Sequence, residues 1–208
     1  MDKLRECVVN LDIAGVQEAC KDTLAHGIPA YKTIVDGLSK GLEMVGQKYE
    51  AREYYLADLM LAGEAMKEGM RILQPRLDKK DVSSIGRVLI GTVRGDLHDL
   101  GKNVVAMFLE AAGFEVTDLG VDVSPEAFTD ALSHYKPHIL GMSALLTTTM
   151  PEMQTTIKEI ERIGLRSGLK IIIGGAPLSP EYGEMIGADA VGKDAVEGAG
   201  ICKAWLSR

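Results

Sequence analysis

The sequence is poor in cysteine, and its cysteines are not spaced for a metal site. Cys7, Cys20 and Cys202 are the three cysteines among 208 residues, and no two of them form a CxxC motif. A structural zinc site needs closely spaced Cys or His pairs, and the disulfide framework of a small secreted domain needs many cysteines, so neither is expected. We expect three reduced thiols in a cytoplasmic protein.

An excess of positive charge and long apolar runs are also absent. The chain has 23 Lys and Arg against 30 Asp and Glu, which gives a formal net charge of −7. An acidic surface does not attract nucleic acid or anionic lipid, so neither partner is expected. No apolar stretch is long enough to span a bilayer, and no signal-peptide core follows residues 1–5, so no membrane association is expected either.

The first part of the chain has helical periodicity and little sign of strands. Apolar residues recur at helical spacing in three segments, 13–24, 34–49 and 56–73. Asp12 suits a helix N-cap, Pro29 a first helical turn, and Pro75 ends the last helix. Together with a short opening helix around Leu4 and Val8, these segments predict a four-helix bundle over residues 1–77. The charged, patternless segment 78–84 is interpreted as a linker.

From residue 85 onward, short apolar runs alternate with helical stretches. The runs are predicted strands at 86–92, 114–119, 138–143, 169–174 and 188–191. The predicted helices lie at 101–112, 125–135, 150–164, 179–186 and 194–206. Five such units predict an α/β fold for residues 85–208: a flavodoxin-like, doubly wound, parallel five-stranded sheet with strand order 2-1-3-4-5. Domains of this type bind their ligands at the carboxyl ends of the strands.

The loops at that edge carry the residues that indicate a chemistry. Asp96 and His98 follow the first predicted strand, and an imidazole held by a carboxylate is a typical arrangement around a metal ligand. Ser143 ends the third strand, across the switch point, so we expect it within hydrogen-bond reach of His98. No phosphate-binding motif of the GxGxxG or GxxxxGK[ST] type is present. A surplus of glycines suggests backbone that a bulky group approaches closely: Gly91, Gly95, Gly101, Gly141, Gly174 and Gly175.

Three motifs in this order resemble the D-x-H-x-x-G, S-x-L and G-G signature of cobalamin-binding domains. They are Asp96-Leu97-His98-Asp99-Leu100-Gly101, Ser143-Ala144-Leu145 and Gly174-Gly175. With its helical first half, the chain resembles the corrinoid methyl-carrier proteins of anaerobic methyltransferase systems. It is also similar to the cobalamin module of methionine synthase. The resemblance spans nearly the whole chain.

The resemblance implies a cobalamin cofactor whose dimethylbenzimidazole tail is detached and whose cobalt takes His98 as its lower axial ligand. It implies that Asp96 and Ser143 complete a catalytic triad with His98. The tail would lie beside Gly174 and Gly175. The other cofactor-binding residues that it implies are Leu145 and Thr147 at the tail, Gly95, Leu97, Asp99 and Gly101 around His98, and Tyr55, Leu59 and Met60 from a helical cap over the upper face.

The function implied by the resemblance is that of a methyl carrier. The carrier accepts a methyl group on cobalt(I) from a substrate-specific methyltransferase. It delivers the group, as methyl-cobalt(III), to a second methyltransferase that serves tetrahydrofolate or coenzyme M. A reductive activating protein would rescue cobalt(II). Such a chain is one subunit of a methyltransferase system rather than a complete enzyme.

Other classes remain open at this point. A cobalamin-dependent sensor that regulates transcription has a similar architecture, but residues 50–78 contain no Trp or His to guard an adenosyl ligand. The small subunit of an adenosylcobalamin mutase normally lacks the helical half. A flavodoxin-like module without any corrinoid is the third alternative.

Overall fold

The computed structural model of the chain describes residues 1–77 and 84–206. The chain divides into two compact units, Met1–Ser83 and Ser84–Arg208. The predicted linker 78–84 lies, apart from Ser84, outside the described residues. None of the helices within the described ranges is both long and apolar enough to cross a membrane.

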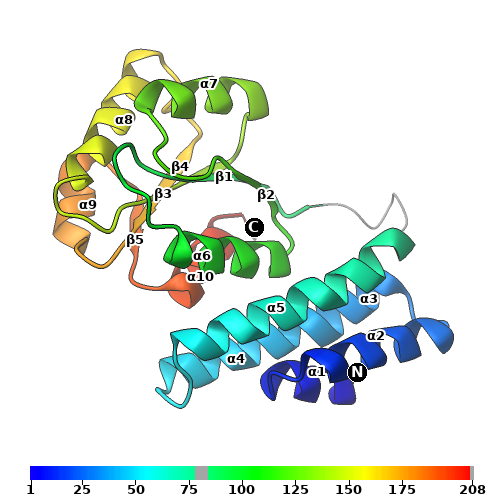
Figure 1. Cartoon of the computed structure of the whole chain (residues 1–208). Coiled ribbons are helices and arrows are strands. Elements are labelled where there is room, and N and C mark those ends of the chain that lie inside the picture. The colour runs from blue at the N-terminus through cyan, green and yellow to red at the C-terminus, as the bar shows by residue number, and fades with distance from the viewer. Residues whose placement is uncertain (78–83, 207–208) are drawn as a thin grey trace. The chain divides into compact units, whose positions relative to one another are not determined.

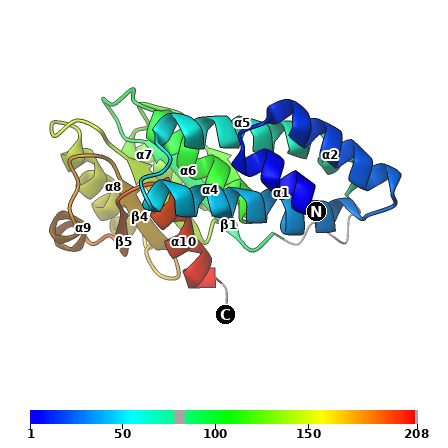
Figure 2. The ribbon, with the colours of Figure 1, turned by 90° about the horizontal axis from the view of Figure 1, so that it is seen from below.

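The first unit is a bundle of helices that pack side by side, as Figure 2 shows for α1, α2 and α5. Its elements are α1 (Asp2–Val9), α2 (Ile13–Ala25), α3 (Ala30–Thr33), the π-helix η1 (Ile34–Ser39), α4 (Lys40–Glu50), α5 (Leu56–Leu73) and the 3₁₀ turn η2 (Gln74–Arg76). α3, η1 and α4 follow one another without a break and count as one long helix. Together with α1, α2 and α5 it gives the four helices that the sequence predicts.

Local signals explain where these helices begin and how closely they pack. The Gly15 amide donates to Asp12 Oδ1 at 2.9 Å, so Asp12 is the N-cap of α2 as predicted. A Cβ at Gly41 would lie 2.8 Å from Val8 Cβ, so the missing side chain lets α1 approach α4 closely. Pro29 is the N-cap residue of α3, one position before the predicted first turn. The π-helix was not predicted; there, the Asp36 carbonyl accepts a hydrogen bond from Arg5 Nε.

The second unit contains a five-stranded parallel sheet. Its strands are β1 (Arg87–Thr92), β2 (Glu115–Asp118), β3 (Ile139–Ser143), β4 (Lys170–Gly174) and β5 (Ala190–Gly192), in the order β2-β1-β3-β4-β5. This confirms the predicted fold class and strand order. The register pairs Thr92 with Ser143, Ser143 with Gly174, and Gly174 with Gly192. These last residues of four strands therefore form a row along the carboxyl edge of the sheet.

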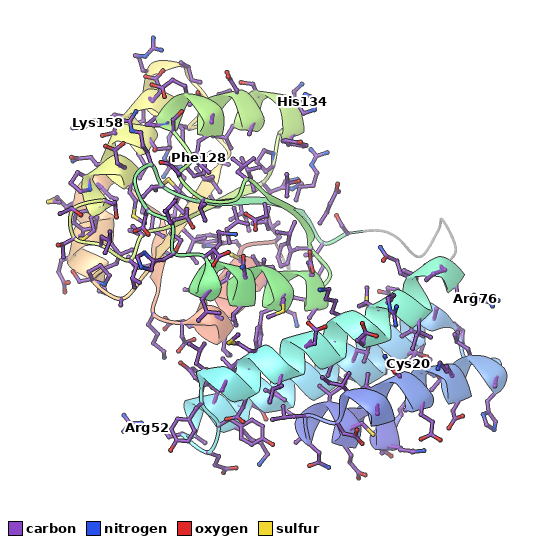
Figure 3. The ribbon with its side chains drawn as sticks, in the orientation of Figure 1. Cys20, Arg52, Arg76, Phe128, His134 and Lys158 are labelled. Carbon is purple, nitrogen blue, oxygen red and sulfur yellow. The ribbon has the colours of Figure 1, made fainter. Side chains whose placement is uncertain are left out.

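Helices cover both faces of this sheet (Figure 1). They are α6 (Leu100–Ala111), α7 (Pro125–Tyr135), α8 (Met150–Arg162), α9 (Pro180–Ile186) and α10 (Ala195–Leu206), with α6 and α10 on one face and α7, α8 and α9 on the other. Figure 3 shows Phe128 reaching from α7 toward the sheet, where it is fully buried. A Cβ at Gly91 of β1 would lie 2.9 Å from the Phe128 ring. This close packing fixes α7 against β1, beside the loop that follows that strand.

Candidate functional site

The loop between β1 and α6 leaves the carboxyl edge in a tight turn. The Asp96 amide donates to the Val93 carbonyl at 3.1 Å, and Gly95 within this turn has a φ of +80°. A left-handed backbone of this kind favours glycine, which explains the residue type there. The buried Thr92 hydroxyl donates to the His98 carbonyl at 3.1 Å. The end of the strand therefore holds both sides of the turn.

Asp96 is the centre of the site, with a side chain that is 0% exposed. Its Oδ1 accepts from the His98 amide (3.0 Å) and His98 Nδ1 (2.7 Å). Its Oδ2 accepts from the amides of Leu145 (2.7 Å) and Leu146 (3.2 Å) and from Thr149 Oγ1 (2.8 Å). Burial alone raises the pKa of this carboxyl group, but the hydrogen bonds, led by that from the His98 amide, outweigh it and hold the pKa well below its usual value. Asp96 is therefore a buried carboxylate ion.

This carboxylate determines the tautomer of His98. An ionised carboxylate only accepts hydrogen bonds, so the proton of the neutral imidazole lies on Nδ1 and the lone pair lies on Nε2. The His98 side chain is 51% exposed, which leaves Nε2 accessible. A neutral, oriented imidazole nitrogen of this kind is what a transition metal binds. Among the described residues, no group of three or more His, Cys, Asp or Glu side chains is placed so that it could hold a metal ion.

The hydroxyl that completes this network is that of Thr149, not that of Ser143. Ser143 lies next to the loop, and its carbonyl accepts from the Val93 amide at 3.0 Å. Its hydroxyl has no partner among the hydrogen bonds of the described residues, so the triad with Ser143 stays a prediction. Thr149 is buried, directly before α8, and its sequence signal was that of a helix cap. Thr147, two residues earlier, is exposed.

The glycines of the site divide into two groups. A Cβ at Gly175, where φ is +145°, would lie 1.8 Å from the Ala144 carbonyl oxygen, so the protein itself requires glycine there. Gly91 and Gly141 are likewise crowded by their own neighbours, which corrects the interpretation that these glycines make room for a ligand. At Gly101 a Cβ would meet no atom within 4 Å, and at Gly174 only the Gly192 carbonyl oxygen, at 3.6 Å.

Comparison with known proteins identifies the family. A family model described as a B12 binding domain matches residues 86–201, and a second model with the same description matches residues 1–74. The chain is 41% identical over 204 residues to "Monomethylamine corrinoid protein 2" of Methanosarcina barkeri. The matched region covers 96% of this chain and 94% of that protein.

The chain belongs to the family of cobalamin-binding corrinoid proteins.

Solved structures agree with this assignment. A cobalamin-binding protein from Desulfitobacterium hafniense matches with a TM-score of 0.82 and 33% identity, over 98% of this chain and 97% of that one. A chain of the methanol:cobalamin methyltransferase complex from Methanosarcina barkeri matches with a TM-score of 0.86 and 25% identity, over 99% of this chain and 78% of that one. The corrinoid methyl-carrier family inferred from the three motifs is thereby confirmed, as is the cobalamin cofactor.

The carboxyl edge of this corrinoid protein fits such a cofactor. His98 presents a free Nε2, and the row Thr92, Ser143, Gly174 and Gly192 offers only small side chains. Several large apolar side chains around His98 are exposed, led by Leu97 at 71%: Leu97, Leu100, Leu145 and Leu146. Exposed apolar side chains gathered at one edge mark a binding surface. Asp99, at the N-cap position of α6, is exposed and accepts from Asn103 Nδ2 at 3.1 Å.

The three residues predicted from the helical unit differ in their accessibility. Tyr55, the N-cap residue of α5, is 70% exposed, and Met60 is 41% exposed. Leu59 is only 1% exposed because it lies in the core of the bundle. The prediction that the Leu59 side chain contacts the cofactor is therefore not supported by its position, whereas Tyr55 and Met60 remain candidates.

Proposed function

We propose that this corrinoid protein carries methyl groups from a substrate-specific methyltransferase to a second methyltransferase, with His98 Nε2 as the lower axial ligand of cobalt. The observation that carries the proposal is the Asp96–His98 pair, which leaves one imidazole nitrogen deprotonated and accessible at the carboxyl edge. When bound, the corrinoid supplies the cobalt that makes and breaks the bond to the methyl group.

The protein's own contribution is to orient the His98 imidazole and to determine which ring nitrogen carries the proton. Asp96 holds the Nδ1 proton and raises the donor strength of Nε2. Thr149 and the amides of Leu145 and Leu146 keep Asp96 ionised and in place. Holding the Nδ1 proton and the orientation of the His98 ring, so that Nε2 would be free to bind the metal, is the role we assign to the network.

The remaining predicted residues are assigned to the cofactor surface. We place the detached tail beside Ser143, Leu145, Thr147, Gly174 and Gly175, at the ends of β3 and β4. In this assignment Gly174 provides the open space, and Gly175 keeps the β4 loop against Ala144. Gly95, Leu97, Asp99 and Gly101 would border the corrin on the His98 side, and Tyr55 and Met60 are the exposed residues of the helical unit that we assign to the cofactor.

We further propose that the methyl donor is a methylated amine. A relative at 41% identity is named for monomethylamine, whereas the structure named for methanol shares 25% identity. The partner that loads the carrier is then a methylamine methyltransferase. The partner that unloads it serves coenzyme M or tetrahydrofolate, and a reductive activating protein returns oxidised cobalt to the cycle.

The test is methyl transfer by the reconstituted protein. The chain is loaded with cobalamin, reduced, and mixed with a methylamine methyltransferase and monomethylamine or with a methanol methyltransferase and methanol. We expect methylation of the corrinoid by the amine system and its loss in His98→Ala, with no change in His134→Ala, which removes an exposed histidine of α7. Methylation by the methanol system alone would refute the donor assignment, and methylation by neither would refute the carrier function.

A further inference from the structure

The carboxylate of Asp122 lies against the backbone that carries Asp96. Asp122 Oδ1 accepts a hydrogen bond from the Gly95 amide at 2.7 Å. The Asp122 amide in turn donates to the Asp96 carbonyl at 3.0 Å. Asp122 thus holds the chain on both sides of the Gly95–Asp96 peptide bond, from a loop between β2 and α7 that is 26 residues away in sequence from Asp96.

The backbone of Asp122 is itself in an uncommon conformation. Its φ is +54°, one of four positive values at non-glycine residues in the described chain. Aspartate tolerates the left-handed region better than most residues but still adopts it infrequently. The next residue, Val123, forms a bridge with Val93 and donates to the Thr92 carbonyl at 2.9 Å. The left-handed turn therefore directs the Asp122 side chain to the Gly95 amide while the chain re-enters the sheet edge.

The turn at Gly95 also depends on an outside partner. Gly95 is exposed and glycine has few conformational restrictions. The bond from the Asp96 amide to the Val93 carbonyl closes the turn, and the Thr92 hydroxyl holds the chain beyond it at the His98 carbonyl, but neither bond reaches Gly95 itself. Asp96 must nevertheless receive five hydrogen bonds from two loops at once. A carboxylate with this many partners needs a fixed backbone, and Asp122 supplies the fixing contact.

We propose that Asp122 is a positioning residue that orients the Asp96–His98 pair through the Gly95 amide. This inference rests on the proposed role of His98 and extends it to a residue that acts through the Gly95 amide rather than through a hydrogen bond to His98. Removal of its carboxylate loosens the Gly95–Asp96 turn, so His98 presents Nε2 less often in the orientation that binds cobalt.

The experiment compares Asp122→Gly, Asp122→Asn and Asp12→Gly with the wild type. Glycine keeps the positive φ and the backbone contact to the Asp96 carbonyl but removes the acceptor for the Gly95 amide. Asparagine keeps an acceptor oxygen and also tolerates the left-handed backbone. Asp12 is a matched control, because its exposed carboxylate also accepts one glycine amide, at 2.9 Å from Gly15, in the helical unit.

The first readout needs no cofactor: amide hydrogen exchange of the apo protein, followed by NMR. In Asp122→Gly we expect roughly tenfold faster exchange of the Gly95 amide and also of the His98 amide, which donates to Asp96. Asp122→Asn and Asp12→Gly should leave both rates near the wild-type values. Faster exchange at Gly95 with an unchanged His98 amide would overturn the proposal, because the contact would then order only the turn.

The second readout is the retention of cobalamin and its histidine-ligated absorbance. We expect Asp122→Gly to weaken retention roughly tenfold, the lower end of the effect of partners that support a metal ligand, and Asp122→Asn to restore it. Unchanged retention and spectrum in Asp122→Gly would overturn the proposal. If the wild type retains no cobalamin, the proposed function fails, and the exchange rates still decide whether Asp122 positions His98.

Discussion

Asp189 and Asp96 each accept hydrogen bonds at opposite edges of the same sheet, and the charges of their partners differ. At the amino edge, Asp189 accepts from the Ile171 amide (2.8 Å) and forms ion pairs with Arg166 (2.8 Å) and Lys170 (3.2 Å). At the carboxyl edge, Asp96 accepts from three amides, one hydroxyl and one imidazole, and no Lys or Arg contacts it within the described ranges.

This difference distinguishes a carboxylate held by cations from a carboxylate held by neutral donors. In both, burial raises the pKa. Hydrogen bonds outweigh it at Asp96, and hydrogen bonds together with the charges of Arg166 and Lys170 outweigh it at Asp189, so both carboxyl groups are ionised. The charge of Asp189 is already balanced by two fixed cations. Asp96 has no Lys or Arg partner among the described residues, and the one ring bonded to it is the His98 imidazole. Neutral donors hold the carboxylate without cancelling the field that the imidazole experiences.

The largest effect that we predict concerns one glycine at each edge. Gly175→Ala would place a Cβ 1.8 Å from the Ala144 carbonyl oxygen at a φ of +145°. Steric overlap and backbone strain together should lower the free energy of unfolding by roughly 3 kcal/mol or more. Gly187→Ala, near Asp189 at a φ of +85°, meets no atom closer than 3.7 Å and should cost about 1 kcal/mol. Denaturant titrations with equal losses for the two variants would contradict this ranking.

The next effect compares the carboxylates directly. Asp96→Asn replaces an acceptor of five hydrogen bonds by a side chain with one acceptor oxygen, which leaves buried donors unpaired and should cost roughly 2–3 kcal/mol. Asp189→Asn loses ion pairs at a partly exposed position and should cost about 1 kcal/mol. Chemical unfolding of both variants at neutral pH measures the difference. A greater loss in Asp189→Asn would show that the ion pairs, and not the neutral donors, dominate the stability of this sheet.

The stability that Asp96 provides should depend on pH. Its pKa in the folded state is held below the unfolded value of about 3.9, so its contribution is complete above that pH and is lost as the pH falls toward the folded pKa. The free-energy gap between wild type and Asp96→Asn should therefore shrink below about pH 4, by up to about 1.4 kcal/mol per pH unit. A gap that widens on acidification would contradict the depressed pKa.

The smallest effect distinguishes the two hydroxyls of the β3 loop. Thr149→Val removes the donor to Asp96 Oδ2 in a buried position and should cost about 1 kcal/mol. Ser143→Ala removes a hydroxyl without a partner among the described residues and should change the stability of the apo protein by less than about 0.5 kcal/mol. Thermal unfolding of the two variants side by side gives the comparison. The reverse order would restore Ser143 as the partner of Asp96.

The sequence predicted the architecture because the periodicity of each element is local. The five strands and their helices follow from short apolar runs that alternate with helical stretches, and the predicted strand order places His98 at the carboxyl edge of the sheet, after β1. The contacts of the β3 loop were not predictable in the same way. Which of Ser143 and Thr149 reaches Asp96 depends on how residues 144–148 turn, and no periodicity encodes that path.

Helix faces and glycines show the same limit. Leu59 and Met60 are consecutive apolar residues of α5, and only the packing of the bundle determines that Leu59 is buried and Met60 exposed. A glycine in the sequence does not reveal whether a ligand or the protein excludes its side chain. Gly175 is crowded by Ala144, whereas Gly101 has open space around it. Distances between segments that are far apart in the chain decide these questions, and they require the folded structure.

The central claim, that His98 binds cobalt through Nε2, is tested most directly by electron paramagnetic resonance of the reduced, paramagnetic cobalt form. The protein is prepared with histidine labelled in the heavy stable isotope of nitrogen and loaded with unlabelled cobalamin. Our account predicts that the triplet splitting of the cobalt lines by ordinary nitrogen becomes a doublet in the labelled protein and that this doublet is absent in His98→Ala. A triplet that persists in the labelled protein would show that the benzimidazole of the cofactor remains the axial ligand, and it would contradict the account.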